Sequence, residues 1–554
     1  MRNLSHKYSK NIVGNLAIAS LVFLSSCKYG PEWDTVYYNV SIHTPERMQD
    51  NSGRGYVAIK DGAIADLGWA DEDNSVPRGA EEVDMKGAHL YPGFIDAHGH
   101  LFGYAHSLHT VSLFGTKSKE ECVARMVEFA AQHPDGWIVG RGWDQNDWAT
   151  QEWPTANDLA PLGNRLVYMT RIDGHAAWVS KSVLEQFNIT AQTTVPGGEV
   201  VVHNGEASGI LIDNAEGLVE VPAPSREEWI QYLLEAQDSL LKYGLTSMTD
   251  AGLDKNQITL LDSLMDADLF HIPMNVMVTY SADDLAWLHN NGPIDKPLLR
   301  VKSVKAYLDG ALGSRGALLR APYHDLPSHY GLQLLPASEL DSLRDLCVQH
   351  GWQLCVHAIG DSAHHLLLQS FAELPEDQDL RFRVEHAQIM TPEDSTYYAH
   401  KNIIPSAQPT HATSDMYWAE DRIGPHRIHH AYSYKRLLNA SGNIALGTDF
   451  PIEQIDPLLT YFAATSRKDL HGHPTGGFLP SQRLSPGQTM YGMTAGAAYA
   501  QFEERKKGRI AIGMAASFTI LNAPLDLHSP EEFGSIHVIG TIVNGQMRYS
   551  NWQN

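Results

Sequence analysis

The feature that most constrains the fold is a series of short apolar runs, each of which ends in a residue able to bind a metal ion. The first run, 94–97, is followed by His98 and His100. Side chains on a strand alternate between its two faces, so these two imidazoles point the same way from one backbone. Two histidines that converge in this manner supply half of a typical site for a first-row metal ion.

Later apolar runs carry or end in residues of the same kind: Lys305, His357, His386 and Asp449. Each has an ordinary interpretation when taken alone, because single histidines at strand ends are mostly hydrogen-bonded and an aspartate after Gly-Thr often begins a turn. The ordered series of six is harder to explain in that way. Barrel enzymes place their chemistry at the carboxyl ends of parallel strands, so the series predicts an α/β fold built on a (β/α)8 barrel.

The same six residues, in this order, resemble the ligand set of the amidohydrolase superfamily. The surrounding sequence is similar to the amidohydrolase family 3 branch, which includes the N-substituted formamide deformylases, from about residue 35 to the end of the chain. The matching motifs are PGFIDAHGH (92–100), GRGWDQ (140–145), DGHAAW (173–178), DGALGSR (309–315), HAIGD (357–361), EHAQ (385–388), QP (408–409) and GTD (447–449).

The resemblance implies two divalent metal ions as cofactors, and zinc is the expected metal, although iron, manganese and nickel also suit such ligands. The first ion would be held by two histidines and the aspartate, the second by the other two histidines, and the lysine would bridge them. In that order, the implied ligands are His98, His100, Asp449, His357, His386 and Lys305.

Lys305 can bridge two cations only after modification, because an ammonium group has no lone pair. Burial and nearby cations favour the free amine of a lysine, which can add carbon dioxide to give a carbamate with two oxygen ligands. We therefore expect carbon dioxide to be bound as Lys305 carbamate. The alternative is an unmodified lysine that pairs with Asp309 or binds substrate while one metal ion does the work.

The activity implied by the resemblance is hydrolysis of C–N bonds other than peptide bonds, as in a substituted formamide or a linear or cyclic amide. Such a reaction needs a hydroxide, a partner for the oxyanion and a proton for the leaving nitrogen. A metal-bridging hydroxide would attack, with Asp449 as general base and acid. Glu385 and Asp361 would orient metal-bound imidazoles, a role that backbone carbonyls could also fill. The other class of function is a non-catalytic ligand-binding lipoprotein that retains the barrel.

Two positions bear on related chemistry in the superfamily. Gly360 stands where nucleoside-type deaminases carry a glutamate, which argues against deamination. Thr249 stands where many relatives carry a histidine on strand 2, so no additional ligand is expected from that strand.

The apolar runs place the eight barrel strands at 94–98, 245–250, 273–280, 301–308, 353–358, 381–386, 403–408 and 443–449, within a barrel domain of 91–499. Helical patterns such as 226–241 and 337–350 lie between them. An insertion of about 101–240 after strand 1 is too long for an ordinary loop and must fold on itself. We expect it to cap the barrel and to bind substrate through these residues: Trp143, Asp144, Asp173 and His175. An aromatic-rich core is the alternative for its tryptophans.

Both chain ends, 35–90 and 500–554, are rich in strand patterns. Asp61-Gly62 and Asn544-Gly545 are two-residue hairpin turns between apolar runs. In the superfamily that the chain resembles, the two ends form a small β-sandwich beside the barrel, and we expect the same here. Ser517 stands in a segment where relatives usually have an aspartate.

The first 26 residues have the pattern of a signal peptide, with basic residues before the apolar run 12–24. The following Cys27 completes a sequence that resembles a bacterial lipobox, which predicts lipidation of Cys27, a tether over 27–34 and an extracytoplasmic protein anchored to a bacterial membrane by lipid alone. The alternative is an ordinary cleaved signal peptide with an incidental cysteine.

Charge and cysteine usage limit the partners. The formal net charge of −24 argues against nucleic acid and leaves a small amide-type molecule as the expected partner. Apart from Cys27, the chain has Cys122, Cys347 and Cys355, an odd number without metal-type spacing, so we expect packing residues and no disulfide framework.

Overall fold

The computed structural model describes residues 33–48, 54–69, 76–172, 174, 176–195, 198–525 and 530–552. The signal segment, Cys27, Asp173 and His175 lie outside these residues, so the predictions made for them stay predictions. Within the described ranges, no helix is long and apolar enough to cross a membrane.

The centre of the molecule is the predicted parallel barrel. Consecutive strands pair in parallel in the order of the chain. They are β6 (Phe94–Gly99), β13 (Leu245–Leu253), β14 (Met274–Thr279), β16 (Leu299–Tyr307), β17 (Gln353–Ala358), β18 (Phe382–His386), β19 (Ile403–Ala407) and β20 (Ala445–Leu446). Each overlaps one predicted run, which confirms the fold class.

The segment after β20 closes the barrel against β6. The backbone N–H of Asp449 donates to the carbonyl of His98 at 2.7 Å, and the N–H of His100 donates to the carbonyl of Phe450 at 2.8 Å. The buried carboxylate of Asp96 accepts from the Thr448 hydroxyl at 2.7 Å. These bonds hold the ends of the first and last strands together, so ligand-type residues from both chain regions meet at one point.

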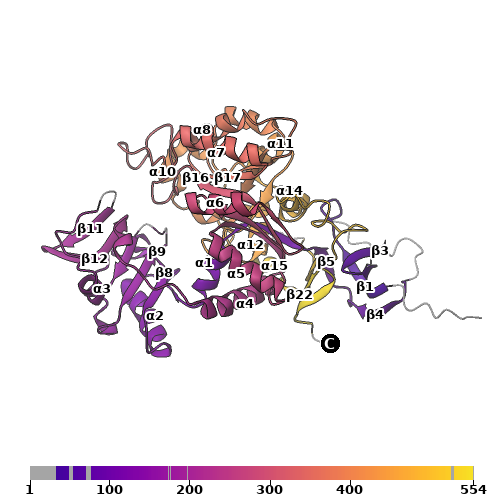
Figure 1. The fold of residues 1–554 in the computed structure, drawn as a ribbon, viewed down its shortest axis with the longest axis horizontal. Helices are drawn as coiled ribbons and strands as arrows, with labels where there is room; N and C mark the ends of the chain where they lie inside the picture. The colour runs from indigo at the N-terminus through magenta and orange to yellow at the C-terminus, as the bar shows by residue number, and fades with distance from the viewer. Residues whose placement is uncertain are drawn as a thin grey trace, which may run out of the picture.

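Amphipathic helices cover the barrel and share one large hydrophobic core with its strands (Figure 1). In most of them the buried positions recur with helical spacing, which favours helix formation in these segments. A Ser225–Glu228 capping box starts the first of them. The main helices are α4 (Arg226–Lys242), α5 (Lys255–Asp266), α6 (Ala282–Asn291), α7 (Ala337–His350), α8 (Asp361–Phe371), α11 (Tyr434–Ser441), α12 (Pro457–Ser466) and α13 (Pro486–Met493).

The two ends of the described chain join in one small β domain, seen at the right of Figure 1. Strand β5 pairs antiparallel with β21, which connects the N-terminal and C-terminal strands in a continuous sheet around a separate apolar core. Both predicted hairpin turns are present, with positive φ at Asp61, Gly62, Asn544 and Gly545. The strands are β1 (Trp33–Ile42), β2 (Arg54–Lys60), β3 (Ala63–Trp69), β4 (Gly79–Asp84), β5 (His89–Pro92), β21 (Phe518–Leu521), β22 (Val538–Val543) and β23 (Gln546–Ser550).

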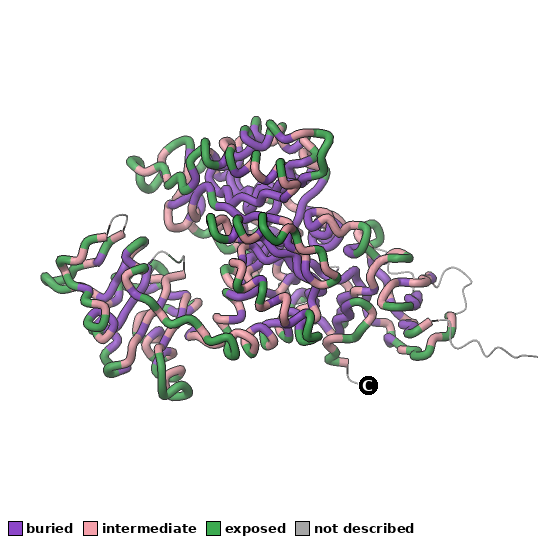
Figure 2. The backbone as a smooth tube through the Cα atoms, viewed as in Figure 1, coloured by how far each residue is buried: buried purple, intermediate pink, exposed green. Residues whose placement is uncertain are grey.

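The insertion after β6 folds as a separate lobe with a buried interior of its own (Figure 2). Its sheet has the order β11-β12-β10-β9-β8-β7. The elements are β7 (Val111–Ser112), α2 (Lys119–Gln132), β8 (Ile138–Trp143), β9 (Val167–Arg171), β10 (Ala176–Val179), α3 (Lys181–Gln186), β11 (Gly198–His203) and β12 (Glu206–Asp213). The lobe is shorter than the predicted 101–240, because helix α1 (Leu101–Ser107) and helix α4 contribute to the barrel core instead.

Candidate metal centre

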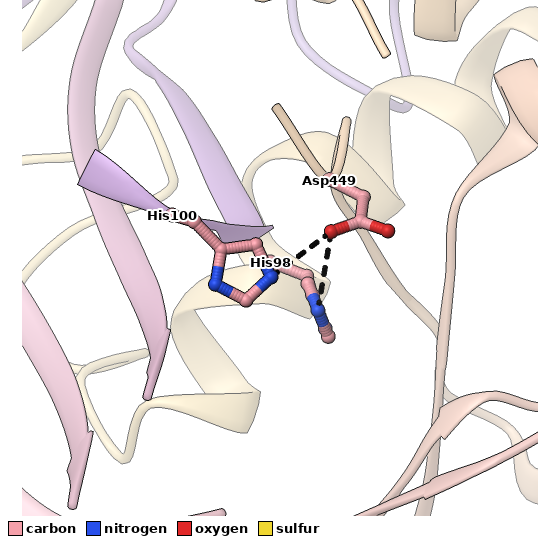
Figure 3. A group of neighbouring side chains, drawn as sticks. All are labelled: His98, His100 and Asp449. Atoms are coloured by element: carbon pink, nitrogen blue, oxygen red, sulfur yellow. Dashed lines mark ion pairs between the residues drawn. The ribbon is translucent and has the colours of Figure 1, made fainter. Parts of the chain in front are cut away.

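The carboxyl end of the barrel brings two predicted histidines to one predicted aspartate. Figure 3 shows His98, in β6, and His100, which directly follows that strand, facing Asp449, which follows β20. Oδ1 of Asp449 lies 3.6 Å from Nε2 of His98 and 3.2 Å from Nε2 of His100. One ligand atom from each residue lies within 4.8 Å of the others, close enough for all three to bind one cation.

The other two predicted histidines lie beside this group. The ring of His386, at the end of β18, has its centroid 4.9 Å from that of His98 and 4.4 Å from that of His357, which lies on β17. The carboxyl ends of β6, β17 and β18 therefore bring the four imidazoles together in one cluster, although these are separated by as many as 288 residues of sequence, the difference between positions 98 and 386.

The environment keeps the buried imidazoles neutral. Burial, with a smaller contribution from the positive charge of Lys305, lowers the pKa of His98 to about 4 and that of His357 to about 3. Burial and the neighbouring imidazoles lower the pKa of His386 well below its usual value. Neutral imidazoles have the free lone pair that metal binding requires.

Several polar atoms of the cluster are buried without a hydrogen-bond partner within the described part of the chain: Nε2 of His98, Nδ1 of His386 and Oδ1 of Asp449. An unpaired buried polar atom costs free energy, so native proteins rarely retain one without a reason. Imidazole nitrogens and a carboxylate oxygen that lack partners in one place are the donor set of a divalent transition metal. The residues present therefore fit a metal centre.

Lys305 lies on β16 beside the imidazoles, with its side chain only 2% exposed. Its Nζ is 4.5 Å from the centroid of the Tyr307 ring, and no ion pair to this lysine is present among the described residues. In particular, the carboxylate of Asp309 accepts from the backbone N–H groups of Ile359 and Gly360 and forms no ion pair with Lys305. The structure therefore does not contain the Lys305–Asp309 pair that the alternative interpretation of this lysine proposed.

The comparisons with known proteins agree with this geometry. Residues 81–549 match the model of the family described as the amidohydrolase family. The chain belongs to the amidohydrolase family. YtcJ of Bacillus subtilis (strain 168) is 30% identical over 509 residues, which are 89% of this chain and 95% of that protein.

Two further similarities extend over almost the whole chain. The N-substituted formamide deformylase of Arthrobacter pascens is 24% identical over 554 residues, which cover 93% of this chain and 98% of that protein. A solved structure described as an uncharacterized metal-dependent hydrolase from Pyrococcus horikoshii OT3 has a TM-score of 0.75 at 27% identity, and covers 91% of this chain and 99% of its own.

A carboxylate orients one histidine of this family member, as the sequence predicted for Glu385. Its Oε2 accepts from Nδ1 of His98 at 2.6 Å, and its Oε1 lies 2.6 Å from Nε of Arg383. Burial raises the pKa of Glu385, but the charge of Arg383 and the contact with His98 outweigh it and lower the pKa to about 2. Asp361, the other predicted orienting residue, instead accepts from the backbone N–H of Arg320.

Backbone geometry at the site is unusual. His386 and Asp449 both have positive φ, 70° and 64°, which is uncommon for residues other than glycine. Such conformations cost about 1–3 kcal/mol each and persist only where the surroundings hold them. At Asp449 the bond from its N–H to the His98 carbonyl provides that restraint.

The packing around Gly360 leaves no room for a side chain at this position. A Cβ atom at this position would lie 2.0 Å from the carbonyl oxygen of Leu318. The loop after β16 therefore occupies the space that any side chain at position 360 would need.

Two of the residues predicted to bind substrate, Trp143 and Asp144, have structural partners within the insertion. Trp143 is fully buried in the core of the lobe, where its Nε1 donates to the carbonyl of Met169 at 2.8 Å and its ring packs against Trp148 and Trp178. The structure thus favours the alternative interpretation, an aromatic core, over a substrate contact by Trp143. Asp144 caps the short 3-10 helix η1 (Gln145–Asp147) and forms an ion pair with Arg171.

His411, which no sequence pattern singled out, lies in helix α9 (Pro409–Asp415) after β19. Its Nε2 is 3.2 Å from Oδ2 of Asp449, and its Nδ1 is 3.0 Å from Oε1 of Glu453. Burial lowers the pKa of His411, but these two carboxylates outweigh it and raise the pKa well above its usual value. The signal was present in the sequence, because His411 follows the matching Gln408-Pro409 motif by only two residues.

Proposed function

We propose that this protein is a metal-dependent hydrolase of C–N bonds other than peptide bonds, with a substituted formamide or a linear or cyclic amide as substrate. The observation that carries the proposal is the cluster of histidines around Asp449 at the carboxyl end of the barrel, in which buried side-chain atoms of His98, His386 and Asp449 have no hydrogen-bond partner among the described residues. The names of two relatives support it, since one is a metal-dependent hydrolase and the other acts on N-substituted formamides.

Two divalent cations, with zinc as the expected metal, would be held by the predicted ligands. The group of His98, His100 and Asp449 would hold the first cation, and His357 with His386 would contribute to the second. When bound, the cations polarise the carbonyl of the substrate and lower the pKa of a water molecule.

Asp449 would move the proton during the reaction. Its carboxylate would take a proton from the attacking water and return it to the leaving nitrogen, which departs as a neutral amine. Glu385 would hold His98 in the orientation that presents Nε2 to the first cation, since it accepts from the other ring nitrogen.

Lys305 would join the site as a carbamate. Its amine and carbon dioxide combine with loss of one proton, and the product has one negative charge shared by two oxygens, which could bridge the cations. The burial of Lys305 without an ion-pair partner among the described residues supports this proposal, because an unpaired ammonium group is costly to bury.

The test is metal analysis of the purified protein together with a hydrolysis screen. The screen contains N-substituted formamides, small linear amides, cyclic amides and a dipeptide, each with and without a chelator. We expect two metal ions per chain and chelator-sensitive hydrolysis of at least one non-peptide amide, and Asp449→Asn should abolish turnover while the protein stays folded. Bound metal without turnover on any compound would favour a ligand-binding role, and cleavage of the dipeptide alone would contradict the proposed bond class.

We also infer that the protein is anchored outside the cytoplasm through a lipid on Cys27, on the strength of the lipobox-like sequence alone. Growth with a radioactive fatty acid should label the wild-type protein and leave Cys27→Ala unlabelled. Equal labelling of both proteins would contradict the anchor.

A further inference from the structure

The carboxylate of Asp449 divides its two oxygens between two sets of partners. Oδ1 faces His98 and His100, whereas Oδ2 lies 3.2 Å from Nε2 of His411. The ring of His411 is in turn held from its other side, because Nδ1 lies 3.0 Å from Oε1 of Glu453. The same Glu453 oxygen accepts from the hydroxyl of Ser414 at 2.6 Å.

The two carboxylates that contact His411 belong to a single turn of the chain. The N–H groups of Ile452 and Glu453 both donate to the carbonyl of Asp449, at 2.9 and 3.4 Å, so Asp449 and Glu453 lie on one face of this turn. His411 comes from a different element, helix α9, and lies between the two carboxylates. It therefore links the segments that follow the seventh and eighth barrel strands.

We propose that His411 is a positioning residue that fixes the rotation of the Asp449 carboxylate. A hydrogen bond to Oδ2 stops the carboxylate from turning, so Oδ1 stays directed at the imidazoles of His98 and His100. The proposal rests on the proposed function, in which Asp449 is both a metal ligand and the group that moves the proton. Glu453 assists by holding the His411 ring in the required orientation.

The geometry also allows another role, since one ligand atom from each of His386, His411 and Asp449 lies within 4.8 Å of the others. The hydrogen bonds argue against His411 as a metal ligand, because both of its ring nitrogens already face carboxylate oxygens. By contrast, Nδ1 of His386 and Oδ1 of Asp449 have no hydrogen-bond partner among the described residues. A cation would thus bind the unpaired atoms of the other residues, while His411 holds the ligand Asp449 in place.

Two substitutions at the same position separate these roles. His411→Ala removes the bond to Asp449, whereas His411→Gln places an amide N–H near the former position of Nε2 and can restore it. Metal content, kcat and KM would be measured for both variants and the wild type. The visible absorption of the Co²⁺-substituted proteins would be recorded as well, because it reports on the ligands without requiring turnover.

A positioning role predicts that His411→Ala keeps the wild-type metal content, that its kcat falls about 10- to 100-fold and that its KM changes little. The Co²⁺ spectrum of this variant should shift, and His411→Gln should recover part of both kcat and the spectrum. Loss of one metal ion per chain in His411→Ala would overturn the proposal, because it would make His411 a ligand. Unchanged kcat and an unchanged spectrum would overturn it as well.

Failure of the proposed function can be recognised separately. If the wild type binds metal but hydrolyses none of the amides, the function fails and the Co²⁺ spectra decide the role of His411 alone. A spectral shift in His411→Ala that His411→Gln reverses would then support positioning, and identical spectra would overturn it. A wild type that binds no metal would overturn both proposals.

Discussion

Replacing Glu385 with glutamine should destabilise the barrel strongly, although the two side chains have nearly the same shape. Glu385 and Arg383 are both fully buried, and their charged atoms lie 2.6 Å apart. The glutamine can still accept from His98, so the main loss is the negative charge. Among the described residues, the partners left to Arg383 would then be neutral ones, such as the carbonyl of Ala97 and the hydroxyl of Ser406.

Removing one member of a buried ion pair typically costs about 3–5 kcal/mol, because the other charge stays buried without compensation. We expect a loss of that order for Glu385→Gln in the free energy of unfolding, measured by urea unfolding of the chelator-treated protein. The double variant Arg383→Met/Glu385→Gln should be more stable than Glu385→Gln alone, since no charge is left unpaired. As a control, Asp34→Asn breaks the exposed pair with Lys60 and should have a much smaller effect.

The reasoning would be refuted if Glu385→Gln were no less stable than the Asp34→Asn control. It would also be refuted if the free energy of unfolding of the double variant were lower than that of Glu385→Gln, so that the two substitutions simply added their losses. Either result would mean that Arg383 does not depend on the charge of Glu385, and that another contact holds this part of the barrel.

Three further predictions address other parts of the molecule. Gly360→Ala should lower stability by about 1–3 kcal/mol or more in thermal or urea unfolding, because its Cβ would overlap the Leu318 carbonyl; a neutral effect would contradict the packing of this loop. Trp143→Phe should destabilise the insertion because it removes the hydrogen bond from Nε1 to the Met169 carbonyl, with KM unchanged, whereas a large rise in KM would restore the substrate-contact interpretation. Cys122, Cys347 and Cys355 are buried and should react with a thiol reagent only after denaturation; fast reaction in the native protein would contradict their burial.

The barrel could be predicted because its strands are apolar runs with ligand-type residues at one end. Buried parallel strands lack the polar alternation of surface strands, so runs such as 353–358 stand out from their surroundings. The hairpins of the terminal domain were equally clear, because Asp-Gly and Asn-Gly turns have strong backbone preferences. Local patterns of this kind determine where strands begin, end and turn.

The missing parts depend on contacts between distant segments. Nothing near Trp143 in the sequence distinguishes a core tryptophan from a pocket tryptophan, since both are aromatic residues in a Gly-containing segment. His411 was missed because it lies in a helix after its strand, where the rule of a ligand at the strand end does not apply. Its contacts with Asp449 and Glu453 depend on how the turn 449–453 packs against that helix, which the local sequence does not indicate.

The central claim is that distant residues meet around a pair of cations at the carboxyl end of the barrel. The most direct test is a crystal structure of the zinc-loaded protein with anomalous diffraction data collected at the zinc absorption edge. The account predicts two anomalous peaks in the cluster, one contacting His98, His100 and Asp449 and the other contacting His357 and His386, with extra density on Lys305 between them. Absence of any peak at this cluster, or zinc bound only at other places on the protein, would contradict it.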